Sequence, residues 1–183
     1  MTPAPVLFIS HGAPTFAIEP GKLGPQLQTL GTRLTGVRAV LVVSPHWQTR
    51  DVQVMATPQP ETVHDFGGFP ARLYALRYPA TGAPQWAAQA AERLLQAGFA
   101  THMDTQRGLD HGAWSPLSLM YPGADIPVVQ FAVMPGADAS AHFELGRRLA
   151  PLTREGVLVL ASGSLTHNLG DMVAGAPENA ALR

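Results

Sequence analysis

Hydrophobic residues gather in four short runs along the chain, at residues 6–9, 37–43, 126–133 and 157–161. Each run is rich in Val, Ile or Leu, shows no alternation with polar residues, and is bounded by Gly, Pro or polar residues. Continuous apolar runs of this length are typical of strands that are buried on both faces of a sheet. We therefore predict four buried strands, together with a shorter strand at residues 52–55.

Between these runs, hydrophobic positions recur with the period of a helix. This spacing predicts three helices, at residues 24–34, 85–97 and 140–150. Residues 58–84 fit neither pattern, and we expect them to form an extended excursion on the surface. The alternation of strands and helices predicts an α/β fold. We expect a mostly parallel or mixed central sheet, covered by helices on both faces, in a single domain over residues 1–183.

The composition excludes several classes of protein. Hydrophobic residues make up 46% of the 183 residues and charged residues 14%, which excludes a disordered chain. The net charge of -1 and the lack of a basic run argue against nucleic acid or an anionic membrane as a partner. We expect a cytoplasmic protein, because the first residues resemble no signal sequence and no window approaches the ~20 apolar residues of a membrane span. With no cysteine, any metal must be held by His, Asp or Glu.

Three of the four predicted strands are each followed by a histidine, namely His11, His46 and His167. Ligands bind at the carboxyl edge of open α/β sheets, and imidazoles from different strands can form a metal site there without a local motif. A single histidine in a loop is more often a surface or capping residue, but the shared position of these three favours a metal site. The nearest candidate carboxylates for a harder ligand are Glu19, Asp51 and Asp171.

Two other histidines lie beside aromatic residues. His111 precedes Trp114, which is either an aromatic wall of the site or a core residue of a helix capped by Asp110. His64 lies in the predicted excursion, where aromatic residues and glycines suit a lid or the rim of a pocket. We expect His64 and Trp114 to contact the substrate.

Five motifs, at residues 10–14, 44–47, 64–70, 110–114 and 163–168, resemble in order those of the class III extradiol ring-cleavage dioxygenases of the DOPA-dioxygenase type. The resemblance implies an α/β fold and a non-haem Fe(II), in some members Zn(II). It also implies that the partners are a small aromatic diol of the catechol type and O2. The sequence predicts neither a particular catechol nor an oligomeric state.

The resemblance also implies roles for individual histidines. His11 and His46 correspond to metal ligands. His167 corresponds to a catalytic acid/base at the edge of the metal, which is sometimes described as a ligand too. His111 corresponds to a catalytic histidine of the second sphere, near the substrate and dioxygen.

Members of this family usually extend beyond the length of this chain, and a further histidine there completes their metal site. We therefore expect the chain to lack that segment, to bind metal weakly or through a substitute ligand, and to turn over catechols slowly or not at all. Two alternatives remain open: a zinc-dependent hydrolase whose histidines activate water, and a degenerate metal-binding relative without catalysis. Ring opening of a catechol under air would separate the dioxygenase from the hydrolase.

Overall fold

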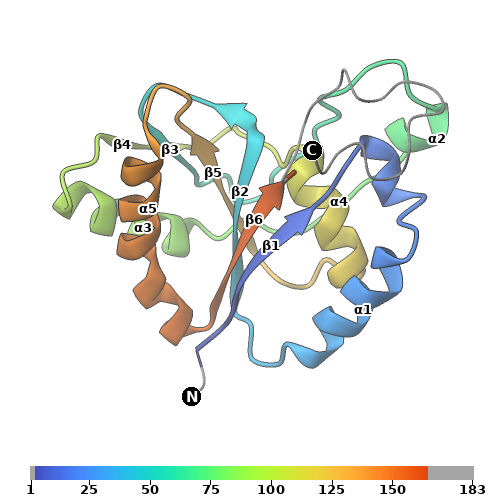
Figure 1. The fold of residues 1–183 in the computed structure, drawn as a ribbon, viewed down its shortest axis with the longest axis horizontal. Helices are drawn as coiled ribbons and strands as arrows, with labels where there is room; N and C mark the ends of the chain where they lie inside the picture. The colour runs from blue at the N-terminus through green and yellow to red at the C-terminus, as the bar shows by residue number, and fades with distance from the viewer. Residues whose placement is uncertain (1–2, 165–183) are drawn as a thin grey trace, which may run out of the picture.

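The four apolar runs of the sequence form four neighbouring parallel strands (Figure 1). The computed structural model describes residues 3–164 of the chain. Its six-stranded sheet has the order β1-β6-β2-β5-β3-β4, in which β3 and β5 are antiparallel and the other neighbours are parallel. The predicted α/β fold with a mostly parallel or mixed sheet is confirmed. The strands are β1 (Val6–Ser10), β2 (Ala39–Gln48), β3 (Val52–Met55), β4 (Thr101–Asp104), β5 (Val128–Val133) and β6 (Val157–Gly163).

Helices cover both faces of this sheet, with α3 and α5 on one side and α1 and α4 on the other (Figure 1). The three helices predicted from periodicity are all present, each displaced by one residue. Helix α1 packs closely against α4 because Gly31 has no side chain: a Cβ there would overlap the carbonyl oxygen of Met120. The long helices are α1 (Leu23–Arg33), α3 (Pro84–Gln96), α4 (His111–Met120) and α5 (Ala139–Leu149). The short ones are η1 (Pro14–Ala17), α2 (Ala71–Tyr74) and η2 (Ala150–Glu155).

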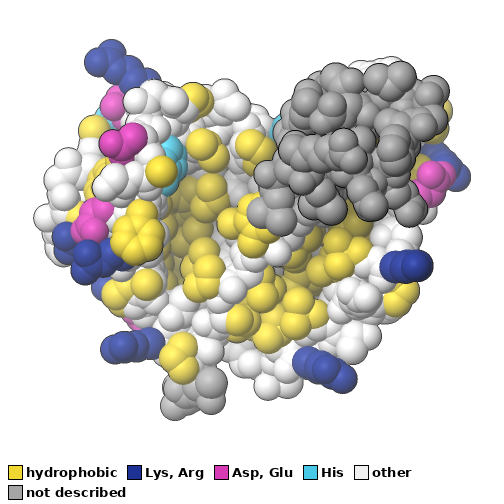
Figure 2. Space-filling model, in the orientation of Figure 1, with side chains coloured by type: hydrophobic (Ala, Val, Ile, Leu, Met, Phe, Trp, Pro, Cys, Tyr) yellow, Lys and Arg dark blue, Asp and Glu magenta, His cyan; other side chains and the backbone are white. Residues whose placement is uncertain are grey.

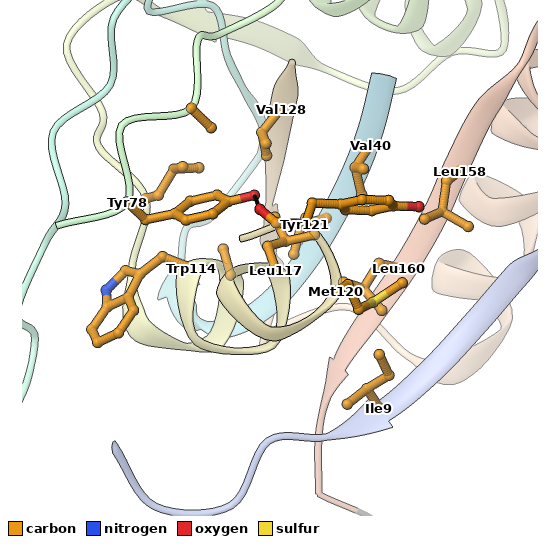
Figure 3. Close-up of a cluster of buried hydrophobic side chains, with 14 of the residues drawn as sticks. Ile9, Val40, Tyr78, Trp114, Leu117, Met120, Tyr121, Val128, Leu158 and Leu160 are labelled. Carbon is orange, nitrogen blue, oxygen red and sulfur yellow. Dashed lines mark hydrogen bonds between the residues drawn. The ribbon is translucent and has the colours of Figure 1, made fainter. Parts of the chain in front are cut away.

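The core consists of two hydrophobic clusters, one on each face of the sheet. Alternate residues of β2 supply both, because side chains of a strand point in turn to opposite faces. Val40 and Val42 pack with α1 and α4, whereas Leu41 packs with α3 and α5. Figure 3 shows the first cluster, in which the hydroxyl of Tyr78 donates to the carbonyl oxygen of Tyr121 at 3.2 Å.

Strand β1 differs from the prediction that all four apolar runs are buried on both faces. Val6 is 65% exposed and Phe8 51% exposed. The reason is the position of the strand in the sheet: within the described residues β1 pairs with β6 alone and forms an edge. An apolar groove of about 390 Å³ runs between β1 and α1, and Figure 2 shows hydrophobic side chains gathered over this part of the surface.

Within the excursion at residues 58–84, the described residues form the short helix α2 before α3 begins at Pro84, but the segment is tied firmly to the rest of the chain. The amide of Val63 donates to the carbonyl of Leu109, and the amide of Leu109 donates to the carbonyl of Glu61, both at 2.8 Å. These bonds hold the excursion directly beside the start of α4. Among the described residues, no helix has the length and apolar character needed to cross a membrane.

Candidate metal centre

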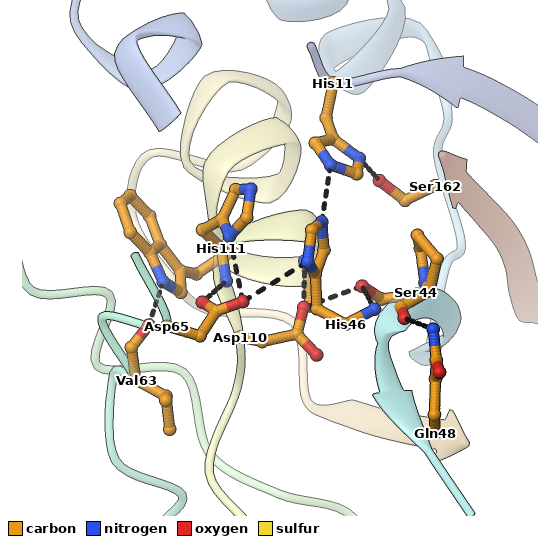
Figure 4. A network of polar contacts seen from close by, with 12 residues as sticks. His11, Ser44, His46, Gln48, Val63, Asp65, Asp110, His111 and Ser162 are labelled. Atoms are coloured by element: carbon orange, nitrogen blue, oxygen red, sulfur yellow. Dashed lines mark hydrogen bonds and ion pairs between the residues drawn. The ribbon is translucent and has the colours of Figure 1, made fainter. Parts of the chain in front are cut away.

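Three histidines from three different elements meet at the carboxyl edge of the sheet (Figure 4). His11 follows β1, His46 lies near the end of β2, and His111 is the first residue of α4. Each offers one ring nitrogen, and these three atoms all lie within 4.8 Å of one another. His11 and His111 are each only 4% exposed, so two of the three imidazoles are shielded from water.

The register of the sheet explains why His11 and His46 lie side by side. Strand β6 lies between β1 and β2, and its residue Ala161 is level with Phe8 on one side and with Val43 on the other. Each histidine follows its level residue by three positions, so both reach the same height above the sheet edge. Their Nε2 atoms are 3.1 Å apart. The sequence had indicated that His46 lies beyond the end of its strand. It lies instead within the irregular end of β2, because this strand changes register between Val43 and Gln48.

Helix α4 approaches these two rings closely because its second residue is Gly112. A Cβ at this position would overlap the hydroxyl of Ser44 and would lie 3.0 Å from Cδ2 of His46 and 3.1 Å from Cε1 of His11. The contact with Ser44 is shorter than real Cβ atoms show, and the contacts with His46 and His11 are tighter than most. Glycine is therefore needed for the helix to bring His111 against the pair.

A buried polar network joins the start of α4 to β2. Asp110 is fully buried and caps the helix by accepting from the amide of Ala113 at 3.3 Å, which confirms the capping interpretation. Its carboxylate also accepts from the hydroxyl of Ser44 at 2.8 Å, from Arg107 at 3.2 Å and from the side-chain amide of Gln130. These bonds fix α4 relative to the strand that carries His46.

Asp65, from the excursion, contacts two of the three histidines, and sequence analysis did not select it. Its Oδ2 lies 3.0 Å from Nδ1 of His111 and 3.5 Å from Nδ1 of His46, and its Oδ1 accepts from the backbone amide of His111 at 2.9 Å. Burial acts to raise the pKa of Asp65, but the hydrogen bonds from His111 outweigh it and lower this pKa from 3.8 to about 2. The carboxylate is therefore ionised at neutral pH. The sequence feature that could have indicated Asp65 is its position next to His64 in the motif at residues 64–70.

Of the carboxylates that the sequence suggested as metal ligands, Glu19 pairs instead with Arg72, and Asp171 lies outside the described residues.

The two residues expected to contact the substrate belong to an aromatic cluster beside the histidines. The ring of His64 lies 5.7 Å from Phe66, 5.9 Å from Tyr74 and 5.8 Å from Trp114, measured between centroids. Its Nε2 is buried and has no hydrogen-bond partner among the described residues. Trp114 is 1% exposed and its indole N–H donates to the carbonyl of Val63 at 2.9 Å, as the alternative interpretation of a core residue requires. Substrate contact by either residue stays a prediction.

His167, the third histidine predicted to follow a strand, lies outside the described residues. The structure instead brings His111 to the pair formed by His11 and His46. No local spacing signal could place His111 there, because it comes from the start of a helix and not from the end of a strand.

The donor set fits a metal ion. Two ligand nitrogens about 2.0–2.1 Å from one ion, at angles between a right angle and the tetrahedral angle, lie about 2.8–3.4 Å apart. The 3.1 Å between the Nε2 atoms of His11 and His46 is within this range. The Nδ1 atoms of all three histidines contact an oxygen, from Ser162 at 2.8 Å for His11 and from Asp65 for the other two. Oxygen contacts at the outer ring nitrogen are characteristic of histidines that bind metal through the inner one.

Comparison with known proteins gives a consistent result. Residues 5–181 match the family model described as the catalytic LigB subunit of aromatic ring-opening dioxygenase. The chain is 46% identical over 164 residues to a 4,5-DOPA dioxygenase extradiol of Beta vulgaris, a match that covers 87% of this chain and 61% of that protein. It is 44% identical over 169 residues to the protein of the same name from Escherichia coli (strain K12), covering 92% of this chain and 62% of the relative.

A solved structure has the same fold. The crystal structure of an uncharacterized protein from Escherichia coli K12 matches with a TM-score of 0.74 and 36% sequence identity, over 92% of this chain and 63% of that one. The chain therefore spans about three fifths of the length of the relatives that it matches.

Proposed function

Because the chain belongs to the family of catalytic LigB subunits of aromatic ring-opening dioxygenases, we propose that it opens the ring of a catechol-type substrate beside the two hydroxyl groups, with O2 as oxidant. The observation that carries this proposal is the cluster of His11, His46 and His111 at the carboxyl edge of the sheet. Ligands bind at this edge in open α/β sheets. A small aromatic diol and O2 are thus the proposed partners, and a cytoplasmic location stays a prediction from the sequence.

We assign His11 and His46 as the metal ligands, with His167 as the predicted further one. When bound, the ion would act as a Lewis acid that lowers the pKa of a substrate hydroxyl. The small number of protein ligands would leave coordination positions open for the reactants. We propose Fe(II), because a metal that can change its oxidation state can activate O2, whereas Zn(II) cannot change its oxidation state. Zn(II) remains the metal of the alternative hydrolase.

His111 is the proposed proton acceptor for the substrate. The ionised carboxylate of Asp65 can only accept hydrogen bonds, so the Nδ1 of His111 carries the proton that it shares with Asp65. In the neutral form of the ring, Nε2 is then unprotonated and can take a proton from a catechol hydroxyl. His167 stays the predicted second acid/base of the site.

The aromatic cluster beside the histidines is the proposed wall for the substrate ring. His64, Phe66 and Tyr74 face one another within 6 Å between centroids, and flat apolar surfaces of this kind favour an aromatic ligand. The buried Nε2 of His64 is the polar atom of this cluster that could contact a substituent of the ring.

The test is aerobic turnover of catechols by the protein loaded with Fe(II) under anaerobic conditions. We expect O2 consumption together with a new absorbance band from the ring-opened product, and we expect both to disappear in His46→Ala. His102→Ala is the control, since His102 is exposed on β4, and it should keep the wild-type rate. A metal-loaded wild-type protein that leaves every catechol intact would contradict the proposal. Ester hydrolysis with Zn(II) would then identify the alternative.

A further inference from the structure

Asp65 touches both a proposed metal ligand and the proposed proton acceptor. Its Oδ2 lies between Nδ1 of His111, at 3.0 Å, and Nδ1 of His46, at 3.5 Å (Figure 4). The side chain of Asp65 is only 18% exposed, and its second oxygen is held by the backbone amide of His111 at 2.9 Å. One carboxylate therefore spans the two rings from the side opposite their inner nitrogens.

The excursion that carries Asp65 is held in place on both sides of this residue. Before it, Val63 accepts the indole N–H of Trp114 at 2.9 Å and donates its own amide to Leu109 at 2.8 Å. After it, the ring of Phe66 meets His111 edge to face with 5.6 Å between centroids. The carboxylate is thus positioned by the same helix that supplies His111.

We infer that Asp65 is a positioning residue that holds the proton of both His46 and His111 on Nδ1, and thereby turns an unprotonated Nε2 of each ring toward the site. The inference rests on the proposed metal site and gives Asp65 a role in that site.

The physical reason is the contrast between a carboxylate and an uncharged partner. An ionised carboxylate accepts but does not donate, so the Nδ1 of His111, hydrogen-bonded to it at 3.0 Å, must carry a hydrogen, and the same negative charge favours a hydrogen on the Nδ1 of His46 at 3.5 Å. A neutral imidazole has only one such hydrogen, which leaves the other nitrogen as the one able to bind metal or accept a proton. Without the carboxylate, nothing holds the hydrogen on Nδ1, and a neutral imidazole in water carries its hydrogen mainly on Nε2. Each ring would have to move that hydrogen before acting.

The experiment compares Asp65→Asn and Asp65→Ala with the control Glu61→Gln, which alters an exposed carboxylate in the same segment. The first measurement is made on metal-free protein, by long-range ¹H–¹⁵N NMR of the histidine rings. We expect Nδ1–H forms for His46 and His111 in the wild type and in Glu61→Gln. In the Asp65 variants we expect a shift toward Nε2–H for both rings, with His102 unchanged.

The second measurement is Co(II) affinity, followed by the visible absorption of the bound ion. Loss of an outer-sphere partner typically lowers metal affinity by about 10- to 100-fold, and we expect a loss of this size in both Asp65 variants. Asp65→Asn keeps the shape of the side chain, so it remains informative if Asp65→Ala does not fold.

Unchanged ring tautomers in Asp65→Asn, with Co(II) affinity within about twofold of wild type, would overturn the inference. A tautomer shift in the variants supports it even if the wild-type protein opens no catechol, because that second result contradicts only the proposed function.

Discussion

The candidate site has two halves that are built in different ways. The strand half consists of His11 and His46, which β1 and β2, the parallel strands on either side of β6, bring to the same height. The helix–loop half consists of His111 and Asp65, which depend on the start of α4 and on an excursion tied to it. Backbone pairing of the strands sets the height of the first half, whereas the second half depends on hydrogen bonds between segments that are far apart in the sequence. The helix–loop half should therefore be the more sensitive to single substitutions.

The largest effect is expected when the helix–loop half loses its buried cap. Asp110→Ala removes hydrogen bonds to Ser44, Arg107 and Gln130 as well as the cap. Because buried partners are left unpaired, we expect the free energy of unfolding to fall by about 3–5 kcal/mol. Asp138→Ala removes the exposed cap of α5, which accepts from Ala141, and should cost about 1 kcal/mol.

Urea unfolding of the metal-free proteins measures both losses. Equal losses for the two caps would show that the network around Asp110 adds nothing to capping, and the expected sensitivity of the helix–loop half would be wrong.

A smaller effect is expected when the two halves are pushed apart. Gly112→Ala places a methyl group against Ser44, His46 and His11. Overpacking of this kind costs about 1–3 kcal/mol, and Co(II) binding should weaken strongly because both rings must move. The control is Gly146→Ala in α5, where a Cβ meets no atom within 4 Å and where alanine favours the helix. Calorimetric melting and Co(II) titration should separate the two variants, and intact Co(II) affinity in Gly112→Ala would contradict this account of the close approach.

The strand half should tolerate the loss of a single side-chain contact. Ser162→Ala removes the hydrogen bond from β6 to Nδ1 of His11, at 2.8 Å, while the backbone that places His11 is unchanged. We expect a loss of about 1 kcal/mol in stability and up to about 10-fold in Co(II) affinity. Ser118→Ala, which removes a hydroxyl bonded within α4, should leave the affinity unaltered. A loss of Co(II) binding in Ser162→Ala as large as that in Gly112→Ala would remove the distinction between the halves.

The smallest effect concerns the attachment of the excursion at high pH. Burial, together with the charge of Asp125 and with Tyr121, raises the pKa of Tyr78 above its usual range. Above about pH 10 the unfolded chain loses the phenolic proton while the folded chain keeps it, so stability falls as the pH rises. Tyr78→Phe should lose about 1 kcal/mol at pH 8 and should show a shallower decline between pH 9 and about 11. Urea unfolding across this range tests the sign, and identical slopes would show that Tyr78 is not the group responsible.

The strand half could be predicted from the sequence because its information is local. An apolar run followed by a histidine is visible in the residues themselves, and parallel pairing brings the ends of such runs to one edge. The same reasoning failed for the burial of β1, which pairs with one strand among residues 3–164, because nothing in residues 6–9 indicates whether a strand has one neighbour or two.

The helix–loop half could not be predicted in the same way. Asp65 is 46 positions from His111, and no pattern of either segment indicates that they meet. The contact depends on the bonds between Val63 and Leu109, which form only when the excursion folds back on the start of α4. The resemblance to a family indicated that His111 lies near the substrate, but it gave no reason for its orientation.

The hydroxyl of Ser162 has a consequence for how an ion could enter the site. If His46 presents an unprotonated Nε2, the 3.1 Å contact requires His11 to donate from its own Nε2, with its Nδ1 accepting from Ser162. An incoming cation needs the opposite arrangement at His11. Because a serine hydroxyl can rotate from donor to acceptor, the hydrogen can pass to Nδ1 and still find a partner there. Loading and unloading at His11 would then proceed without net exchange of a proton with the solvent.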